Sequence, residues 1–214
     1  IAPDGRNTVI DGDSSSEALT VEEVTDALEA MKGSKYFVTG FEVPTKVSLA
    51  GAARAHELGM VTVLNPSPLP DRPLVALDFI DYLFVNEVEA AKVASCDSDD
   101  PVTLAHEVKE RTGVGNVVIT LGGEGSCCLD VRGTFTRVDP VRVDKVVNTA
   151  GAGDGFMAAT VARLVRGSSL VEAMRWASAY AALCVTIDGT IPAYRPLVEV
   201  EEFIAGLGSQ DVAS

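Results

Sequence analysis

The sequence predicts an α/β domain with a mostly parallel central sheet and helices on both of its faces. Short runs of β-branched and aromatic residues alternate with amphipathic helical stretches as far as Gly122. The runs are almost continuously apolar, which is typical of parallel strands buried on both faces. With 47% apolar and 22% charged residues in 214 residues, the chain can bury enough surface for one sizeable core.

The expected elements follow one another in βαβα order. The strands are Lys35–Gly40, Val61–Asn65, Asp81–Asn86 and Asn116–Gly122. The helices between them are Val21–Met31, Lys46–Leu58, Glu87–Ala94 and Val102–Thr112. After Gly125 the pattern changes, because "GSCCLD" and "TFTRVD", separated by "VRG", predict an antiparallel hairpin. Three further helices are expected at Gly151–Arg166, Leu170–Ile187 and Leu197–Leu207.

Charge and cysteine usage exclude several classes of function. The net charge is −14, from 31 acidic and 17 basic residues, and the basic residues form no cluster. Nucleic acid and membrane surfaces are therefore not expected partners, and a phosphate ligand would need backbone dipoles or a metal to hold it. The four cysteines show no CxxC spacing, which favours a reduced, cytoplasmic setting.

The stretch "NTAGAGDGF" leaves one carboxylate, Asp154, among small residues at the start of a predicted helix. Gly151, Ala152 and Gly153 leave backbone N–H groups bare there, and the helix dipole adds positive potential, so an anion site is expected. Asp154 is either a helix cap or a general base that takes a hydroxyl proton while the N–H groups hold phosphoryl charge. The neighbours are too small to cap or pack, which favours the general base.

Two other glycine-rich mechanisms fail on spacing. A Walker loop requires a Gly-Lys dipeptide, and the chain contains none. A dinucleotide fingerprint requires a third glycine that Gly151-Ala152-Gly153 lacks at the right spacing.

Two further motifs follow strand ends, and each has a structural and a functional interpretation. In "NEVE", Asn86 caps the following helix with Glu89 in its first turn, or the two side chains hold water around Mg²⁺. In "TLGGEG", Thr120–Gly125, the glycines make a tight turn into the hairpin, or they let the backbone approach a ligand. That ligand would lie at the carboxyl ends of the parallel strands.

Taken together and in this order, the motifs resemble the ribokinase-like (PfkB) carbohydrate kinases. The resemblance covers essentially the whole chain and is carried by "LNPSPLP", "VNEVEA", "VVITLGGEG", "VVNTAGAGDGF" and "VTIDGTIP". "LNPSP" and "NEVEA" are most similar to the ribokinase branch of the family. The resemblance implies a ribokinase-like three-layer α/β/α fold, here with the lid strands largely absent.

The resemblance also implies roles for individual residues. Asp154 would be the base for the sugar hydroxyl, with Gly151, Ala152 and Gly153 as its anion hole. Glu89 would hold Mg²⁺ through water, and Glu42 lies where the family has a sugar-contacting acid. The nucleotide-binding positions implied are Asn86, Thr120, Gly122, Gly123, Gly125 and Ser178.

Two departures from the family pattern change these expectations. Asn148 and Ala150 match a monovalent cation site, where ribokinases usually carry Asp at the first position. Asn keeps an oxygen but lacks the charge, so K⁺ activation is expected to be weakened. The family's first ~90 residues, with a sugar-binding motif and most of the lid, have no counterpart, and because the chain starts at Ile1 we expect an upstream segment outside it.

The expected activity is ATP-dependent phosphorylation of a sugar hydroxyl, with ribose converted to ribose 5-phosphate. Residues 1–18 are interpreted as a remnant of lid strand and linker, and residues 19–214 as the nucleotide-binding and catalytic core. ATP, Mg²⁺ and K⁺ are the expected cofactors, and a homodimer is a candidate state of the full-length protein. The alternatives are a nucleotide-binding module without turnover, an inactive fragment, or a kinase for fructose or adenosine.

Overall fold

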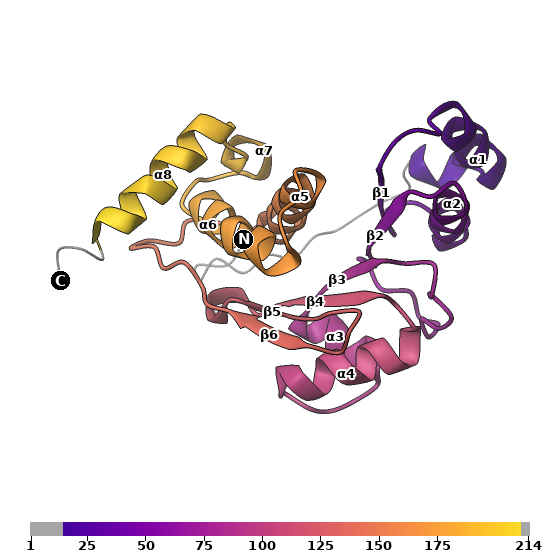
Figure 1. Ribbon diagram of the computed structural model, residues 1–214, viewed down its shortest axis with the longest axis horizontal. Coiled ribbons are helices and arrows are strands. Elements are labelled where there is room, and N and C mark those ends of the chain that lie inside the picture. Colours follow the sequence, from indigo (N-terminus) through magenta and orange to yellow (C-terminus); the bar gives the residue numbers. More distant parts are fainter. Residues whose placement is uncertain (1–14, 211–214) are drawn as a thin grey trace. The chain divides into compact units, whose positions relative to one another are not determined.

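The structure is a computed structural model that describes residues 15–210 (Figure 1). It divides into two compact units. We call them the sheet unit, residues 15–121 and 127–137, and the helical unit, residues 122–126 and 138–210. Most of the predicted lid remnant lies outside the described residues. Its last four residues, Ser15–Ala18, form the short 3-10 helix η1.

The strands described form one six-stranded sheet in the order β1-β2-β3-β4-β5-β6. They are β1 Tyr36–Gly40, β2 Val61–Asn65, β3 Tyr82–Asn86, β4 Asn116–Thr120, β5 Ser126–Leu129 and β6 Phe135–Val138. Strands β1 to β4 pair in parallel, as their apolar runs predict. The Asp130 N–H donates to the Thr134 carbonyl at 3.0 Å and closes the turn between β5 and β6. The predicted α/β fold with a mostly parallel sheet is thus confirmed.

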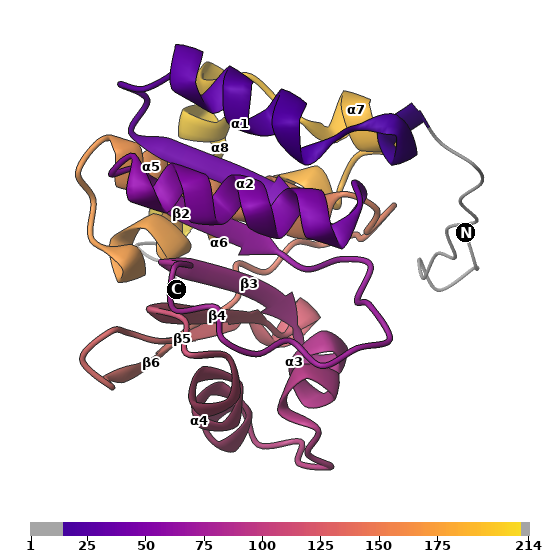
Figure 2. The same cartoon turned by 90° about the vertical axis from the view of Figure 1, so that its right-hand side faces the viewer.

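Four helices accompany the parallel strands in the sheet unit. They are α1 Val21–Ala30, α2 Thr45–Glu57, α3 Glu87–Ala94 and α4 Pro101–Thr112. Helix α2 packs on β1 and β2, and α3 and α4 pack on β3 and β4 (Figure 2). The sequence sets several of the helix ends. Asp100 caps α4 ahead of a proline in its first turn, and Gly113 ends α4 at a φ of 76°.

The core of the sheet unit lies between the strands and these helices. Leu64, Leu83 and Ile119 from the strands are fully buried, and they share one cluster with Leu104 and Val108 of α4. Each such side chain contributes roughly 1.5–3 kcal/mol by leaving water. The same burial holds the strand ends in register, so the side chains that follow them have defined positions.

The helical unit contains the 3-10 helix η2 Gly122–Glu124 and the helices α5 Ala152–Val165, α6 Leu170–Cys184, α7 Thr190–Ala193 and α8 Leu197–Gln210. Helices α5 and α6 pack against each other. Helix α6 ends three residues before the predicted Ile187, and the N–H groups of Thr186 and Ile187 bond only three residues back. The Val185 carbonyl accepts the N–H groups of Val147 and Asn148. Among the residues described in either unit, no helix is both long and apolar enough to cross a membrane.

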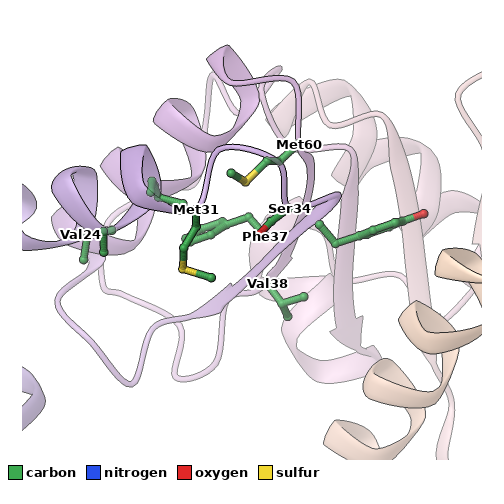
Figure 3. A pocket seen from close by; sticks show the side chains of 9 residues that line it. Val24, Met31, Ser34, Phe37, Val38 and Met60 are labelled. Atoms are coloured by element: carbon green, nitrogen blue, oxygen red, sulfur yellow. The ribbon is translucent and has the colours of Figure 1, made fainter.

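An apolar hollow of about 320 Å³ lies between α1 and β1 in the sheet unit (Figure 3). Val24, Leu28, Met31, Phe37 and Met60 contribute to its lining. None of the residues predicted to bind nucleotide, sugar or metal borders it. Most of the predicted site residues lie instead at the strand ends and at the start of α5.

Candidate active site

In the sheet unit, polar residues gather at the carboxyl edge of the parallel strands. Gly40 and Asn65, the last residues of β1 and β2, are register partners. Asn86 and Thr120, the last residues of β3 and β4, are partners in the same way. Parallel α/β sheets bind ligands at this edge. The predicted residues Asn86 and Thr120 are therefore adjacent, and Asn65 joins them from the "LNPSP" motif.

Glu42 lies at the same edge, two residues after β1. A Cβ added to Gly40 would collide with Glu42 Oε2 and lie 3.2 Å from the Asn65 carbonyl oxygen. Glycine at position 40 thus lets the exposed Glu42 carboxylate lie against the end of β1. The Glu42 carbonyl also accepts a hydrogen bond from Ser16 Oγ at 2.7 Å. This bond holds the Glu42 backbone, and the carboxylate itself is open to solvent, as a sugar-contacting acid requires.

Asn86 and Glu89 form a capping box at the start of α3. Asn86 Oδ1 accepts the Glu89 N–H at 2.8 Å, and Glu89 Oε2 accepts the Asn86 N–H at 2.9 Å. The structural interpretation of "NEVE" is therefore correct: the pair satisfies free donors at the helix start. A metal-related role then depends on the atoms that the box leaves unused.

The unused atoms suit a hard cation bound through water. In the described part of the chain, no hydrogen bond uses Glu89 Oε1, and a carboxylate oxygen is the donor type that Mg²⁺ prefers. Among residues 15–210, no three His, Cys, Asp or Glu side chains lie close enough together to hold a metal directly. The donor set fits an ion that keeps most of its water, and it does not fit a closed protein cage.

The glycines after β4 have separate structural causes. Gly122 and Gly125 have φ of 54° and 92°, and the Gly125 N–H donates to the Gly122 carbonyl at 3.3 Å. A Cβ at Gly125 would lie 2.9 Å from the Pro140 nitrogen, so this glycine is needed for packing within the helical unit. Cβ atoms at Gly122 and Gly123 would meet open space. These two positions leave the backbone accessible to a ligand.

The loop before α5 begins with Gly151, the N-cap, at a φ of 78°. A Cβ there would lie 2.5 Å from Thr190 Cγ2 and 2.6 Å from the Tyr194 hydroxyl oxygen, so only glycine fits. The Ala152 N–H donates to the Thr149 carbonyl at 3.2 Å. The prediction that all three amides are bare is therefore wrong for Ala152, because a local turn uses its N–H. The Gly153 N–H has no acceptor among the residues described, and a Cβ at Gly153 would meet open space.

Asp154 lies in the first turn of α5 and is exposed. The N-cap residue is Gly151, no side chain caps this helix, and no hydrogen bond described over residues 15–210 uses the Asp154 carboxylate. The capping interpretation is therefore wrong. An exposed carboxylate beside the N–H groups of a helix start can accept a proton from an incoming group.

The side chain of Asn148 is buried, with 4% of its surface exposed. Its Oδ1 accepts the Ala150 N–H at 2.9 Å, and its Nδ2 donates to Asp188 Oδ1 at 3.2 Å. The two positions predicted for a monovalent cation are thus bonded to each other. Asp188, which the sequence motifs do not predict as a site residue, supplies a carboxylate to this pair.

Ser178 and Tyr194 differ in the contacts of their hydroxyl groups. Ser178 is buried within α6, and its hydroxyl donates to the Met174 carbonyl at 3.0 Å, so the predicted nucleotide-binding residue is occupied within its own helix. Tyr194 was not predicted, yet its hydroxyl donates to the Gly151 carbonyl at 3.1 Å. Burial and the nearby Asp154 raise the pKa of Tyr194 above its ordinary value. No local spacing connects residues 43 positions apart, so the sequence held no signal for this contact.

The chain is similar to known proteins over most of its length. The model of the pfkB family of carbohydrate kinases matches residues 1–196. A ribokinase of Arabidopsis thaliana is 29% identical over 88% of this chain and 51% of its own, and one of Staphylococcus aureus (strain COL) is 27% identical over 93% and 66%. The structure of Arabidopsis thaliana ribokinase complexed with ribose and ATP superposes with a TM-score of 0.77 at 27% identity, covering 83% of this chain and 58% of that one.

The chain spans about half to two thirds of the length of these relatives. The family model nevertheless matches most of its residues, including every motif described above. The chain belongs to the pfkB family of carbohydrate kinases.

Proposed function

We propose that the protein transfers a phosphoryl group from ATP to a sugar hydroxyl and converts ribose to ribose 5-phosphate. One observation carries the proposal. The Asp154 carboxylate is exposed in the first turn of α5, makes no hydrogen bond within residues 15–210, and follows Gly153, whose N–H is also unused. Family membership supports the reaction class, and similarity to ribokinases supports the sugar.

In the proposed reaction Asp154 accepts the proton of the sugar hydroxyl as that oxygen attacks phosphorus. The new oxygen–phosphorus bond forms while the bond to the bridging oxygen of ATP breaks, and ADP leaves with that electron pair. The N–H groups of Gly151 and Gly153 stabilise the charge on the phosphoryl oxygens. Glycine at 153 keeps the approach open. Little covalent chemistry is asked of the protein, so positioning dominates.

The residues of the sheet edge have supporting roles in this proposal. Asn86 and Glu89 orient the phosphates and the water shell of Mg²⁺, which supplies charge neutralisation when bound. Thr120, Gly122, Gly123 and Gly125 bind the nucleotide, and Glu42 contacts the sugar. The Ser178 hydroxyl is engaged within α6, so its contribution beside the adenine is limited to packing.

The proposal extends to the protein's setting. We place it in the cytoplasm, where reducing conditions suit its four free cysteines, and we include a homodimer of the full-length protein. K⁺ activation is expected to be weak, because the Asn148 side chain is already bonded to Ala150 and Asp188.

The test is a substrate panel on the full-length protein with Mg-ATP, reading ADP release for ribose, fructose, deoxyribose and adenosine. Ribose is expected to give the highest kcat/KM. A preference for fructose or adenosine would reassign the substrate and keep the kinase. No ADP release with any of the four would contradict the kinase.

A second candidate is a nucleotide-binding module without turnover. The observation that favours it is the Ala152 N–H, which donates to the Thr149 carbonyl and so leaves fewer free donors for a phosphoryl group than the motif predicts. An intact mass near 22.4 kDa for the natively produced protein, together with ATP binding and no turnover, would support this candidate. A larger mass with turnover would exclude it.

A further inference from the structure

We propose that Tyr194 is a positioning residue for the start of α5, holding the Gly151 carbonyl so that the neighbouring N–H groups and Asp154 face the substrate correctly. The inference rests on the proposed kinase function and adds to it a residue from the segment after α6. Tyr194 lies at the C-cap of α7 and belongs to the same helical unit as the loop that it contacts.

Two donors meet at the Gly151 carbonyl oxygen. It accepts the Gly155 N–H at 2.8 Å, which is the first hydrogen bond of α5, and it also accepts the Tyr194 hydroxyl at 3.1 Å. Two donors from different directions fix the orientation of this carbonyl. The carbonyl shares a rigid peptide plane with the Ala152 N–H, which donates to the Thr149 carbonyl. The hydroxyl therefore helps to set the plane from which the first turn continues to Gly153 and Asp154.

The Tyr194 ring lies against the start of α5. A Cβ at Gly155 would lie 3.3 Å from Tyr194 Cε1 and 3.1 Å from Tyr180 Cε1. A Cβ at Gly151 would lie 2.6 Å from the Tyr194 hydroxyl oxygen. Two of the three motif glycines, 151 and 155, thus make room for Tyr194, while Gly153 borders open space. Part of the glycine motif serves the tyrosine, and part serves the ligand.

The Tyr194 hydroxyl keeps its proton at neutral pH. Burial raises the pKa of Tyr194, and the Asp154 carboxylate raises it further. The hydroxyl therefore remains a donor throughout the neutral and mildly alkaline range.

The segment that carries α7 is attached to the loop before α5 by other bonds as well. The Asn148–Asp188 bond and the bonds from Val147 and Asn148 to the Val185 carbonyl already join the segment after α6 to the loop. Removal of the hydroxyl should therefore leave the fold in place. What changes is the precision of the loop, to which phosphoryl transfer is sensitive because its donors act at hydrogen-bond distance.

The test is Tyr194→Phe in the full-length protein, with Tyr180→Phe as the matched control. Both variants remove one hydroxyl from a ring that packs on Gly155, but the Tyr180 hydroxyl contacts Cys184 and not the loop. We expect Tyr194→Phe to lower kcat about tenfold, with the KM for ATP and sugar within about twofold of wild type. Amide exchange at residues 151–156 should become faster, and the control should match wild type in all three readouts.

The outcomes distinguish this inference from the proposed function. A wild-type protein that turns over no sugar defeats both. An active wild type whose Tyr194→Phe variant keeps its kcat or its exchange rates overturns the inference alone. A parallel loss of kcat and thermal stability in both Phe variants also overturns it, because the aromatic packing would then be the cause. A fall in kcat that is specific to Tyr194→Phe, with unchanged KM and melting temperature, supports it.

Discussion

Asn148 donates its side-chain Nδ2 to Asp188 Oδ1 at 3.2 Å, across 40 positions of sequence. The bond gives the buried Asn148 amide a carboxylate partner. One carboxylate remains in this pair, contributed by Asp188, and the amide oxygen of Asn148 is used by the Ala150 N–H. A monovalent cation would have to compete with that N–H for the oxygen. If the protein has the proposed kinase activity, we therefore expect no strong rate increase in K⁺ over Na⁺, and such an increase would contradict the weakened site.

Asn148→Asp should create a cation requirement. Two carboxylates at hydrogen-bond distance repel each other, so one must take up a proton or a cation. At pH 8 in choline chloride we expect the melting temperature to fall by about 2–8 °C, as for roughly 1–2 kcal/mol in a domain of this size, and K⁺ to restore it. Thermal unfolding in choline, Na⁺ and K⁺ measures this without reference to activity. Asn65→Asp, at the end of β2, is the control, and an equal K⁺ response in it would show a nonspecific salt effect.

Asp154→Asn should lower kcat by about two decades or more, the size expected for loss of a general base. Asn keeps the shape of Asp and removes only the proton acceptor, and the exposed carboxylate makes no hydrogen bond within residues 15–210 that the change would break. KM and the melting temperature are therefore expected to stay near wild type. Steady-state kinetics with the preferred sugar measure the effect, and Asp26→Asn on the exposed face of α1 is the control. An unchanged kcat removes Asp154 from the role of base.

Gly153→Ala should separate activity from stability. The position is helical and its Cβ would meet open space, so alanine is expected to stabilise α5 by about 0.5–1 kcal/mol. The added methyl group would stand beside the free N–H that we propose as a donor to the phosphoryl oxygens, and we expect kcat to fall at least about tenfold. Urea unfolding and steady-state kinetics on the same preparation give both numbers.

Gly151→Ala is the comparison for that variant. Its φ of 78° and the contacts with Thr190 and Tyr194 predict a loss of about 1 kcal/mol or more in the free energy of unfolding, together with a loss of activity. If Gly153→Ala were as unstable as Gly151→Ala, the space around residue 153 would be filled and the assignment of its N–H would fail.

Local signals account for what the sequence predicted. The strands are visible as short apolar runs because a parallel strand is buried on both faces, and β2 begins and ends at the predicted residues. The capping box of Asn86 and Glu89 is visible because its partners are three residues apart. The contacts of Tyr194 and Asp188 join segments 43 and 40 residues apart, and no periodicity encodes them. The N–H of Ala152 was misjudged because a turn with Thr149 competes for it.

Glu89→Gln should distinguish the structural from the metal-related role of the capping box. Gln retains the hydrogen bond to the Asn86 N–H, so the melting temperature is expected to stay within about 2 °C of wild type. The loss of the charge should raise the Mg²⁺ concentration for half-maximal rate about tenfold or more. The measurement is a Mg²⁺ titration at fixed MgATP. The matched variant is Glu172→Gln, which changes the same type of box at the start of α6 and should leave the Mg²⁺ dependence unchanged.

The adjacent thiols of β5 predict how stability responds to alkaline pH. Burial, with help from Cys128, raises the pKa of Cys127 from about 9 to about 12, and burial, with help from Asp130, raises that of Cys128 to about 11. Above pH 9 the unfolded chain releases these protons while the folded chain keeps them. The free energy of unfolding must therefore fall as pH rises, by up to about 1.4 kcal/mol per unit for each thiol.

Urea unfolding between pH 8 and 10 measures this slope. The range stops there because four tyrosines with raised pKa values, Tyr36, Tyr82, Tyr180 and Tyr194, add the same effect at higher pH. Changing Cys127 and Cys128 to alanine should reduce the slope to the part contributed by Cys184, whose pKa burial also raises. The change should also lower stability at pH 7, since both side chains are buried. In the native protein at pH 8, Ellman's reagent should label the half-buried Cys96 far faster than the other three thiols. Rapid labelling of Cys127 or Cys128 would mean that β5 opens readily, and the predicted slope would then be absent.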